Sequence, residues 1–135
     1  MRVVPDANVL VSAALSRSGA PAALLAAALE AEIDLVACPA LLDETARALA
    51  SPKLRTRVAP ADAERLLDLV RELADVVPDP EGPAPIHSPD PADDYLLALA
   101  AREQVPLVSG DEHLLGLRGR APVLSPREFL EQLLE

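Results

Sequence analysis

Short apolar runs alternate along this chain with longer stretches that have helical periodicity. Apolar runs of about four residues that are bounded by turn residues predict strands. These strands are expected at residues 2–5, 34–37, 75–77, 106–109 and 121–124. Stretches in which apolar residues recur every three or four positions predict helices. The helices are expected at residues 9–15, 22–30, 39–50, 61–74, 92–103 and from 126 onward.

Proline and capping residues mark several of these boundaries. Pro21 and Pro126 fit the first turn of a helix, where the missing N–H has no partner to lose. Ser125 and Glu128 have the spacing of a capping box. Residues 78–91 hold six of the chain's 14 prolines and are expected to form a semi-rigid loop rather than a domain linker.

The order of these elements predicts the fold class. Strands that alternate with helices favour an α/β fold whose parallel sheet is covered by helices on both faces. We therefore expect a three-layer α/β/α sandwich with a central parallel sheet of four or five strands. A length of 135 residues suits one domain, residues 1–135. Because half of the residues are hydrophobic and 1% are aromatic, Leu, Ala and Val must form the core.

The net charge of −10 counts against a uniformly basic surface that grips nucleic acid. It leaves room for a local basic patch beside an acidic metal site. The single cysteine, Cys38, excludes an intramolecular disulfide and fits a reducing compartment. The apolar run 20–29 is too short to span a bilayer, and Asp6 interrupts any signal peptide. A cytoplasmic protein without a membrane segment is expected.

Asp6 follows a predicted strand directly, and Asp111 follows another after one residue. The carboxyl edge of an open α/β sheet is where ligands bind, and Arg2 is the only basic residue near Asp6 in the sequence. Asp111 comes after Gly110, which allows a tight turn. Asp111 also has the position of an N-cap for a short helix at residues 112–115, and the two roles are compatible.

Asp93 and Glu44 lie on predicted helices beside buried positions. Asp93 shares the inward face of its helix with Leu96 and Ala100, although a charge effect at the helix N-terminus also explains an acid there. Asp94 is one step round the helix and is expected to be exposed. Glu44 borders the buried stripe of its helix, and alone it would be an ordinary surface residue.

Together these four acids come from different elements that open at one edge of the sheet. Oxygen ligands with few nitrogens favour Mg²⁺ or Mn²⁺ over zinc. His87 and His113 are the only histidines, and neither stands in a recognisable Ser-His-Asp arrangement. With five glycines in the chain, no glycine-rich phosphate loop is present.

Four segments then form a larger pattern: residues 6–12 (DANVLVS), 41–44 (LLDE), 90–101 (DPADDYLLALAA) and 107–111 (LVSGD). Their order, spacing and apolar context resemble the PIN-domain ribonucleases, close to the VapC-type toxins of bacterial toxin–antitoxin pairs. The resemblance covers nearly the whole chain. It implies hydrolysis of phosphodiester bonds, usually in RNA, with Mg²⁺ or Mn²⁺ as cofactor.

The resemblance also implies roles for individual residues. The acidic positions of the family fall on Asp6, Glu44, Asp93 and Asp111, and polar positions near the pocket fall on Asn8, Ser12 and Ser109. Asp6 is expected to be the central metal ligand, completed by Asp93 and Asp111. Glu44 would bind a second metal or orient water. Asp90 and Asp94 remain substitutes for Asp93.

Substrate and partners follow from the same interpretation. Candidate contacts to the RNA backbone are Arg17, Lys53, Arg55 and Arg57, with Arg102, Arg118 and Arg120 as weaker candidates. The alternative for residues 53–57 is a solvated loop. The family implies a cognate antitoxin protein and a homodimer. Helix 61–74 or 22–30 could supply the dimer interface, unless both apolar stripes face the core.

Three other functions fit the sequence less well. A phosphatase of the haloacid-dehalogenase type needs Asp-x-Asp and usually a lysine, whereas here Asn8 occupies the third position and Lys53 is the only lysine. A response-regulator receiver would need a late lysine that this chain lacks. A non-catalytic protein that uses a PIN fold for binding is disfavoured by the complete set of four acids.

Overall fold

Five short strands pair side by side in the computed structural model, which describes residues 1–134. They are β1 (Arg2–Pro5), β2 (Asp34–Ala37), β3 (Asp75–Val76), β4 (Leu107–Val108) and β5 (Val123–Leu124). All pairs are parallel, and the order across the sheet is β3-β2-β1-β4-β5. The predicted parallel sheet of an α/β sandwich is confirmed.

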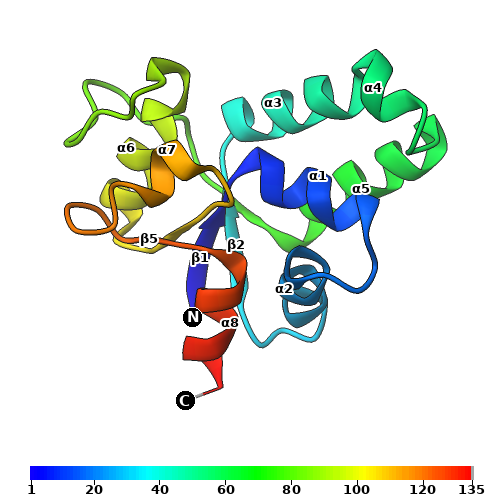
Figure 1. Cartoon of the computed structure of the whole chain (residues 1–135), viewed down its shortest axis with the longest axis horizontal. Coiled ribbons are helices and arrows are strands. Elements are labelled where there is room, and N and C mark those ends of the chain that lie inside the picture. The colour runs from blue at the N-terminus through cyan, green and yellow to red at the C-terminus, as the bar shows by residue number, and fades with distance from the viewer. Residues whose placement is uncertain (135) are drawn as a thin grey trace.

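Helices occupy most of the connections between strands (Figure 1). They are α1 (Ala7–Leu15), α2 (Ala20–Leu29), α3 (Pro39–Ala50), α4 (Pro52–Arg55), α5 (Pro60–Leu73), the 3₁₀ turn η1 (Pro91–Asp93), α6 (Asp94–Glu103), α7 (Glu112–Leu115) and α8 (Pro126–Leu133). Within residues 1–134 no single helix is long and apolar enough to cross a membrane, and α1 with α2 passes that test of length and composition only across a 98° bend.

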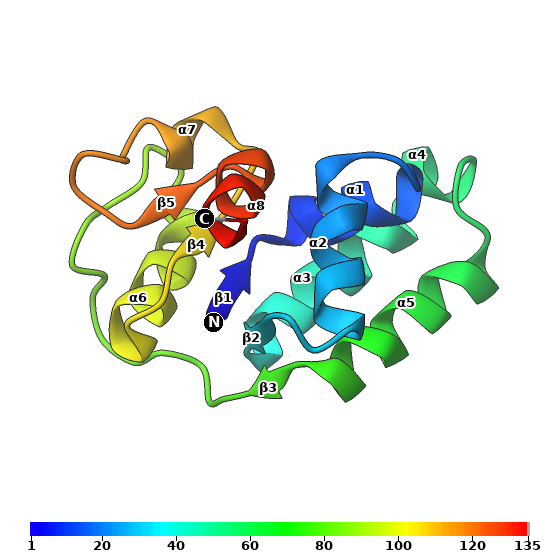
Figure 2. The same ribbon diagram turned by 90° about the horizontal axis from the view of Figure 1, so that it is seen from below.

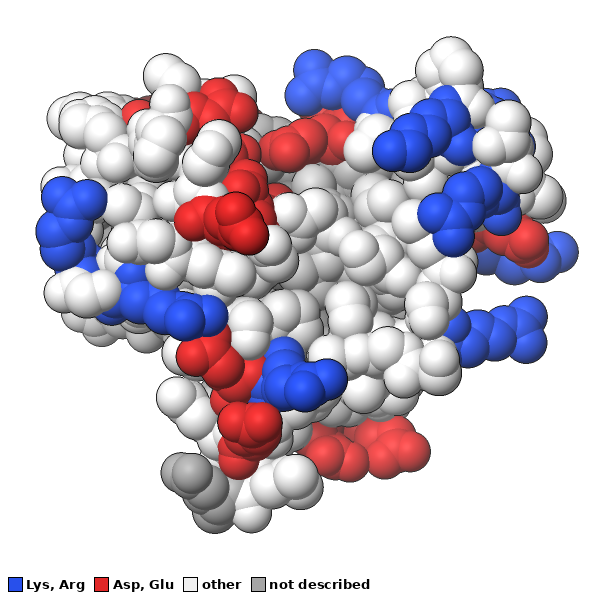
Figure 3. All heavy atoms as spheres, in the orientation of Figure 1, with Lys and Arg blue, Asp and Glu red and all other residues white. Residues whose placement is uncertain are grey.

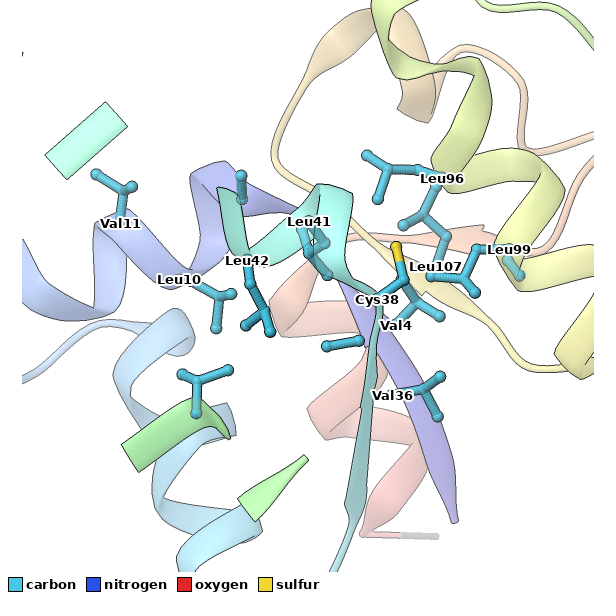
Figure 4. Close-up of a cluster of buried hydrophobic side chains, with 14 of the residues drawn as sticks. Val4, Leu10, Val11, Val36, Cys38, Leu41, Leu42, Leu96, Leu99 and Leu107 are labelled. Atoms are coloured by element: carbon cyan, nitrogen blue, oxygen red, sulfur yellow. The ribbon is translucent and has the colours of Figure 1, made fainter. Parts of the chain in front are cut away.

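Alternate residues of the central strands point to opposite faces of the sheet, as the pleat of a strand requires. On one face Val3, Leu35 and Val108 pack with side chains of α2 and with Phe129 of α8. On the other, Val4, Val36 and Leu107 pack with side chains of α3, α5 and α6 (Figure 4). In the view from below, β4 lies between α6 and α8 (Figure 2). The result is the expected three-layer arrangement.

The topology creates a switch point beside β1. From this central strand the chain first moves to β2 and later reaches β4 on the other side, so the connections leave β1 in opposite directions. Such a point opens a crevice outside the carboxyl ends of the strands. Asp6 follows β1 directly, and Asp111 follows β4 after two residues. The fold therefore brings the ends of both predicted segments to one crevice.

Three local differences from the sequence predictions affect the crevice. Helix α1 begins at Ala7 rather than at residue 9, because Asp6 is extended and its carbonyl already accepts from the N–H of Val9. The basic segment after Ser51 forms α4, which the Ser51 side chain caps. The helix expected from residue 92 starts instead as η1, and Asp93 lies at the junction of η1 and α6.

Candidate active site

A cavity of about 310 Å³ opens at the carboxyl end of β1. Its lining consists of Asp6, Ala7, Asn8, Val11, Ser12, Glu44, Ala48, Asp90, Asp93 and Asp111. All four predicted acids meet there, together with Asp90. Among the described residues no Lys, Arg or His lines the cavity. Five carboxylates therefore face one another without a protein cation between them.

Asp6 lies at the bottom of this cavity and is 3% exposed. Burial raises the pKa of its carboxyl, the hydrogen bond from Ser109 opposes that rise, and the negative charge of Glu44 adds to it. The Ser109 hydroxyl, itself fully buried, donates to Asp6 Oδ2 at 2.7 Å. Arg2 does not neutralise Asp6, because it pairs with Asp75 at the other end of β1. A buried carboxylate that no basic side chain neutralises still favours an added cation.

Asp93 enters the cavity from the other side. It is the N-cap residue of α6, but its side chain makes no capping hydrogen bond and remains free. The pKa of Asp93 is raised to about 6, first by burial and then by the charges of Asp6, Asp90, Asp111 and Glu44 in that order. The carboxylates of the cavity thus repel one another, so each makes ionisation of Asp93 harder.

Glu44 is held by a residue that the sequence prediction missed. The Tyr95 hydroxyl, on α6, donates to Glu44 Oε1 on α3 across 51 residues. Burial, followed by this hydrogen bond, raises the pKa of the Tyr95 phenol. Tyr95 is the only tyrosine in the chain and directly follows the acidic pair at residues 93–94. A single tyrosine next to two candidate site acids is the sequence signal that could have revealed this role.

The N-cap role predicted for Asp111 is confirmed, and the residue also lies at the cavity. Its Oδ1 accepts from the N–H of His113 at 2.9 Å and so caps α7, while its side chain also lines the cavity. The backbone N–H of Asp111 donates to the Ser109 hydroxyl at 2.9 Å, which joins Asp111 to Asp6 through one side chain. Asn8 and Ser12 are exposed and form part of the rim on α1.

Asp90 and Asp94, the two possible substitutes for Asp93, differ in whether they face the cavity. Asp90 lines the cavity and caps η1 by accepting from the N–H of Ala92. Asp94 points away, because its oxygens accept from the N–H of Ser88 at 2.7 Å and pair with His87 at 2.8 Å. The expectation that Asp94 is exposed is wrong, since its side chain is 22% exposed and anchors the proline-rich loop. Asp90 is therefore the additional acid of the cavity.

The predicted basic residues lie to one side of the acids. Lys53 and Arg55 are on α4, Arg57 follows it, and Arg17 lies between α1 and α2. All four are exposed, and none lines the acidic cavity. Figure 3 shows Lys and Arg gathered over α4 and the neighbouring end of α1. Arg55 lines a separate groove of about 260 Å³ between α3 and α5.

The three weaker basic candidates differ in their surroundings. Arg102 donates to the carbonyls of Pro78 and Asp79 and holds the start of the proline-rich loop. Arg118 pairs with Glu128 at 2.6 Å. Arg120 is exposed. Two of the three thus have structural partners, which leaves Arg17 and residues 53–57 as the main basic candidates.

The donors of the cavity fit a hard divalent cation. They are carboxylates, an amide and a hydroxyl, the oxygen ligands that Mg²⁺ and Mn²⁺ prefer. No three His, Cys, Asp or Glu side chains of residues 1–134 are close enough together to form a preassembled metal site. Mg²⁺ commonly binds one or two carboxylates and keeps several waters, so an open acidic cavity is compatible with it.

The fold is an α/β domain with an acidic crevice, lined by no basic residue, at the switch point of its parallel sheet. The profile of the PIN domain family matches residues 2–113, which include Asp6, Glu44, Asp93 and Asp111. The chain belongs to the PIN domain family, whose members are generally nucleases and usually use divalent metal ions. A search of the curated proteins gave no match.

Proposed function

We propose that this chain is a Mg²⁺- or Mn²⁺-dependent ribonuclease that hydrolyses phosphodiester bonds in RNA. The observation that carries the proposal is the cavity in which five carboxylates meet without a lining cation. Membership of the PIN domain family supports the class of reaction. The preference for RNA rests on the resemblance of the four sequence segments to PIN-domain ribonucleases, and such a substrate would place the activity in the cytoplasm.

Each residue of the cavity has a role that follows from its position. A bound divalent cation neutralises the phosphodiester and lowers the pKa of a water molecule. Asp6, deep in the cavity and fixed by Ser109, would hold that cation centrally, with Asp93 and Asp111 beside it. Glu44, on the opposite wall, would orient water or hold a second cation. The rim residues Asn8 and Ser12 would contact substrate or metal-bound water.

The basic residues supply what the acidic cavity lacks. An RNA strand needs cations along its phosphates, and Lys53, Arg55, Arg57 and Arg17 lie on one side of the cavity at the surface. An RNA whose scissile phosphate lies over Asp6 would extend along α3 toward α4. The net charge of −10 makes this local patch, rather than the overall surface, the binding determinant.

We further propose that the chain is the toxin of a toxin–antitoxin pair, bound by a cognate antitoxin protein, on the strength of its resemblance to VapC-type toxins. A homodimer is part of the same proposal. Both helices bury an apolar stripe, α5 through Ala63, Leu66 and Val70 and α2 through Leu24, Ala27 and Ala28. Because α2 also exposes Leu29 (54%), we propose α2 as the interface. Sedimentation velocity that finds only monomer at high concentration contradicts the dimer.

The phosphatase alternative gains no support from the cavity. Asn8 takes the place of a second aspartate, and Lys53 is on α4 outside the cavity lining. Metal titration distinguishes the ribonuclease from the non-catalytic alternative, because only the ribonuclease requires Mn²⁺ to bind at Asp6. Calorimetry that detects no divalent cation binding to the wild type would favour the non-catalytic protein.

The decisive experiment compares wild type with Asp6→Asn in an RNA cleavage assay containing Mg²⁺, Mn²⁺ or chelator. Cleavage should require the metal, and Asp6→Asn should retain less than about one hundredth of the wild-type cleavage rate. Loss of even an outer hydrogen-bond partner of a metal ligand lowers metal affinity or activity 10–100-fold. Asp34→Asn, an exposed change at the start of β2, is the matched control. Full activity of Asp6→Asn in excess Mn²⁺ would refute the assignment.

A further inference from the structure

Glu44 stands at the boundary between two cavities. One is the acidic cavity that contains Asp6. The other, of about 510 Å³, is lined by Ala40, Asp43, Glu44, Arg47, Asp79, Ala92 and Tyr95. Glu44 contributes to the lining of both, whereas Tyr95 contributes to the second alone. Because the side chain is half-buried and flanked by open space on two sides, its direction is not fixed by packing alone.

Tyr95 and Arg47 line the second cavity together with Glu44. Tyr95 donates its hydroxyl to Oε1. Arg47 lies three residues further along α3, on the same helix face, and lines the second cavity. In the part of the chain that the structure describes, Arg47 is exposed and forms no ion pair. Rotation of Glu44 toward Arg47 would therefore take the carboxylate out of the acidic cavity.

The physical balance favours Tyr95 over Arg47. An exposed ion pair on a helix surface gains little, because water screens it and two long side chains must be ordered. A hydrogen bond from a neutral hydroxyl to a carboxylate is charge-assisted and stronger than one between neutral groups. Tyr95 is also held in place, since its ring packs against the core beside the buried Leu96 and Leu97.

We propose that Tyr95 is a positioning residue that holds Glu44 in the acidic cavity. Its hydroxyl occupies Oε1, leaves Oε2 for the metal ion or its water, and prevents rotation of Glu44 toward Arg47. This inference rests on the proposed metal-dependent function and adds to it a residue outside the acidic set. The chain has only one other aromatic, Phe129, and that ring is fully buried in the core.

The test is a calorimetric Mn²⁺ titration of Tyr95→Phe, which removes the hydroxyl and keeps the ring. Affinity should fall on the order of 10-fold, as for other residues that orient metal ligands. Adding Arg47→Gln to Tyr95→Phe should restore part of that affinity, because the competing cation is gone. Arg71→Gln, on α5 with Asp68 as its partner, is the matched control and should restore nothing.

A second pair of variants separates positioning from packing. In a Glu44→Ala background the change Tyr95→Phe should cause no further loss of Mn²⁺ affinity, whereas a packing role predicts the same loss as in wild type. Equal Mn²⁺ affinity of wild type and Tyr95→Phe overturns the positioning role and leaves the ribonuclease proposal intact. Wild type that binds Mn²⁺ but cleaves no RNA refutes the ribonuclease while the titrations still decide on Tyr95. Wild type that binds no Mn²⁺ overturns both.

Discussion

Ser109 and Asp6, 103 residues apart, share a buried hydrogen bond of 2.7 Å. The same hydroxyl accepts from the backbone N–H of Asp111 at 2.9 Å. The hydroxyl hydrogen can point to only one acceptor, so the N–H of Asp111 directs it toward Asp6. One serine at the end of β4 thus ties the deepest carboxylate of the cavity to the acid that follows the neighbouring strand.

Removal of that hydroxyl in Ser109→Ala should destabilise the metal-free protein by about 1–2 kcal/mol at pH 7.5, because a buried carboxylate loses its donor. Ser109 lowers the pKa of Asp6, so its loss raises that pKa further above the unfolded value. Ionised Asp6 then lowers the free energy of unfolding by more. The destabilisation by Ser109→Ala should fade at low pH, where Asp6 is protonated. Urea denaturation at both pH values measures it. Ser12→Ala, on the exposed rim, should change little.

Asp93→Asn should stabilise the metal-free protein. The pKa of Asp93 is raised from 3.8 to about 6 in the folded chain, so ionisation of this acid opposes folding. The loss of stability from ionised Asp93 is absent below about pH 4 and complete above about pH 6. After allowance for solvent screening, we expect a gain of about 1 kcal/mol at pH 7.5 and none at pH 4. Denaturation in chelator tests this, and Asp34→Asn should show no such pH-dependent gain.

The Asp93 carboxyl should also give metal binding a pH dependence. A proton and a divalent cation compete for the same carboxylate, and the cation must displace the proton below about pH 6. Apparent Mn²⁺ affinity should be nearly constant from pH 7 to 8 and fall up to about tenfold per pH unit below 6. Titrations at several pH values measure the slope. A slope unchanged in Asp93→Asn would show that another group controls the competition.

Particular residues explain how far the sequence alone could predict this site. Asp6 and Asp111 follow predicted strands, and parallel strands present their carboxyl ends at one edge, so their proximity followed from the fold class. Asp93 and Glu44 required the helices to turn the right face inward. Apolar neighbours such as Leu96 specified that face, because an exposed leucine would lose its burial.

Other features depended on local geometry that periodicity does not encode. Residues 91–93 form a 3₁₀ turn with three residues per turn, and α6 begins only at Asp94. This change of pitch turns Asp94 toward Ser88 and leaves Asp90 at the cavity, although both acids are equally polar in sequence. The hydrogen bond between Tyr95 and Glu44 spans 51 residues and depends on how α6 and α3 pack.

The last prediction concerns substrate binding by α4. Neutralising Lys53, Arg55 and Arg57 together should weaken RNA binding, because each phosphate that these side chains no longer neutralise keeps its counterion. The slope of log affinity against log salt should become shallower by about 0.7 for each such phosphate, the value for single strands. Fluorescence anisotropy with Asp6→Asn as the background measures binding without cleavage. In a chain that keeps Asp6, the triple variant should retain wild-type Mn²⁺ affinity, since none of these side chains lines the acidic cavity.

The matched control for that experiment neutralises Arg65 and Arg71 on α5, which pair with Asp62 and Asp68 three residues earlier on the same helix. Their charges are already compensated locally, so their removal should leave the salt slope nearly unchanged. An equal change of slope in both sets of variants would mean that binding depends on overall charge rather than on a patch. An unchanged slope in the α4 variant would move the RNA path away from α4, toward Arg17 at the end of α1.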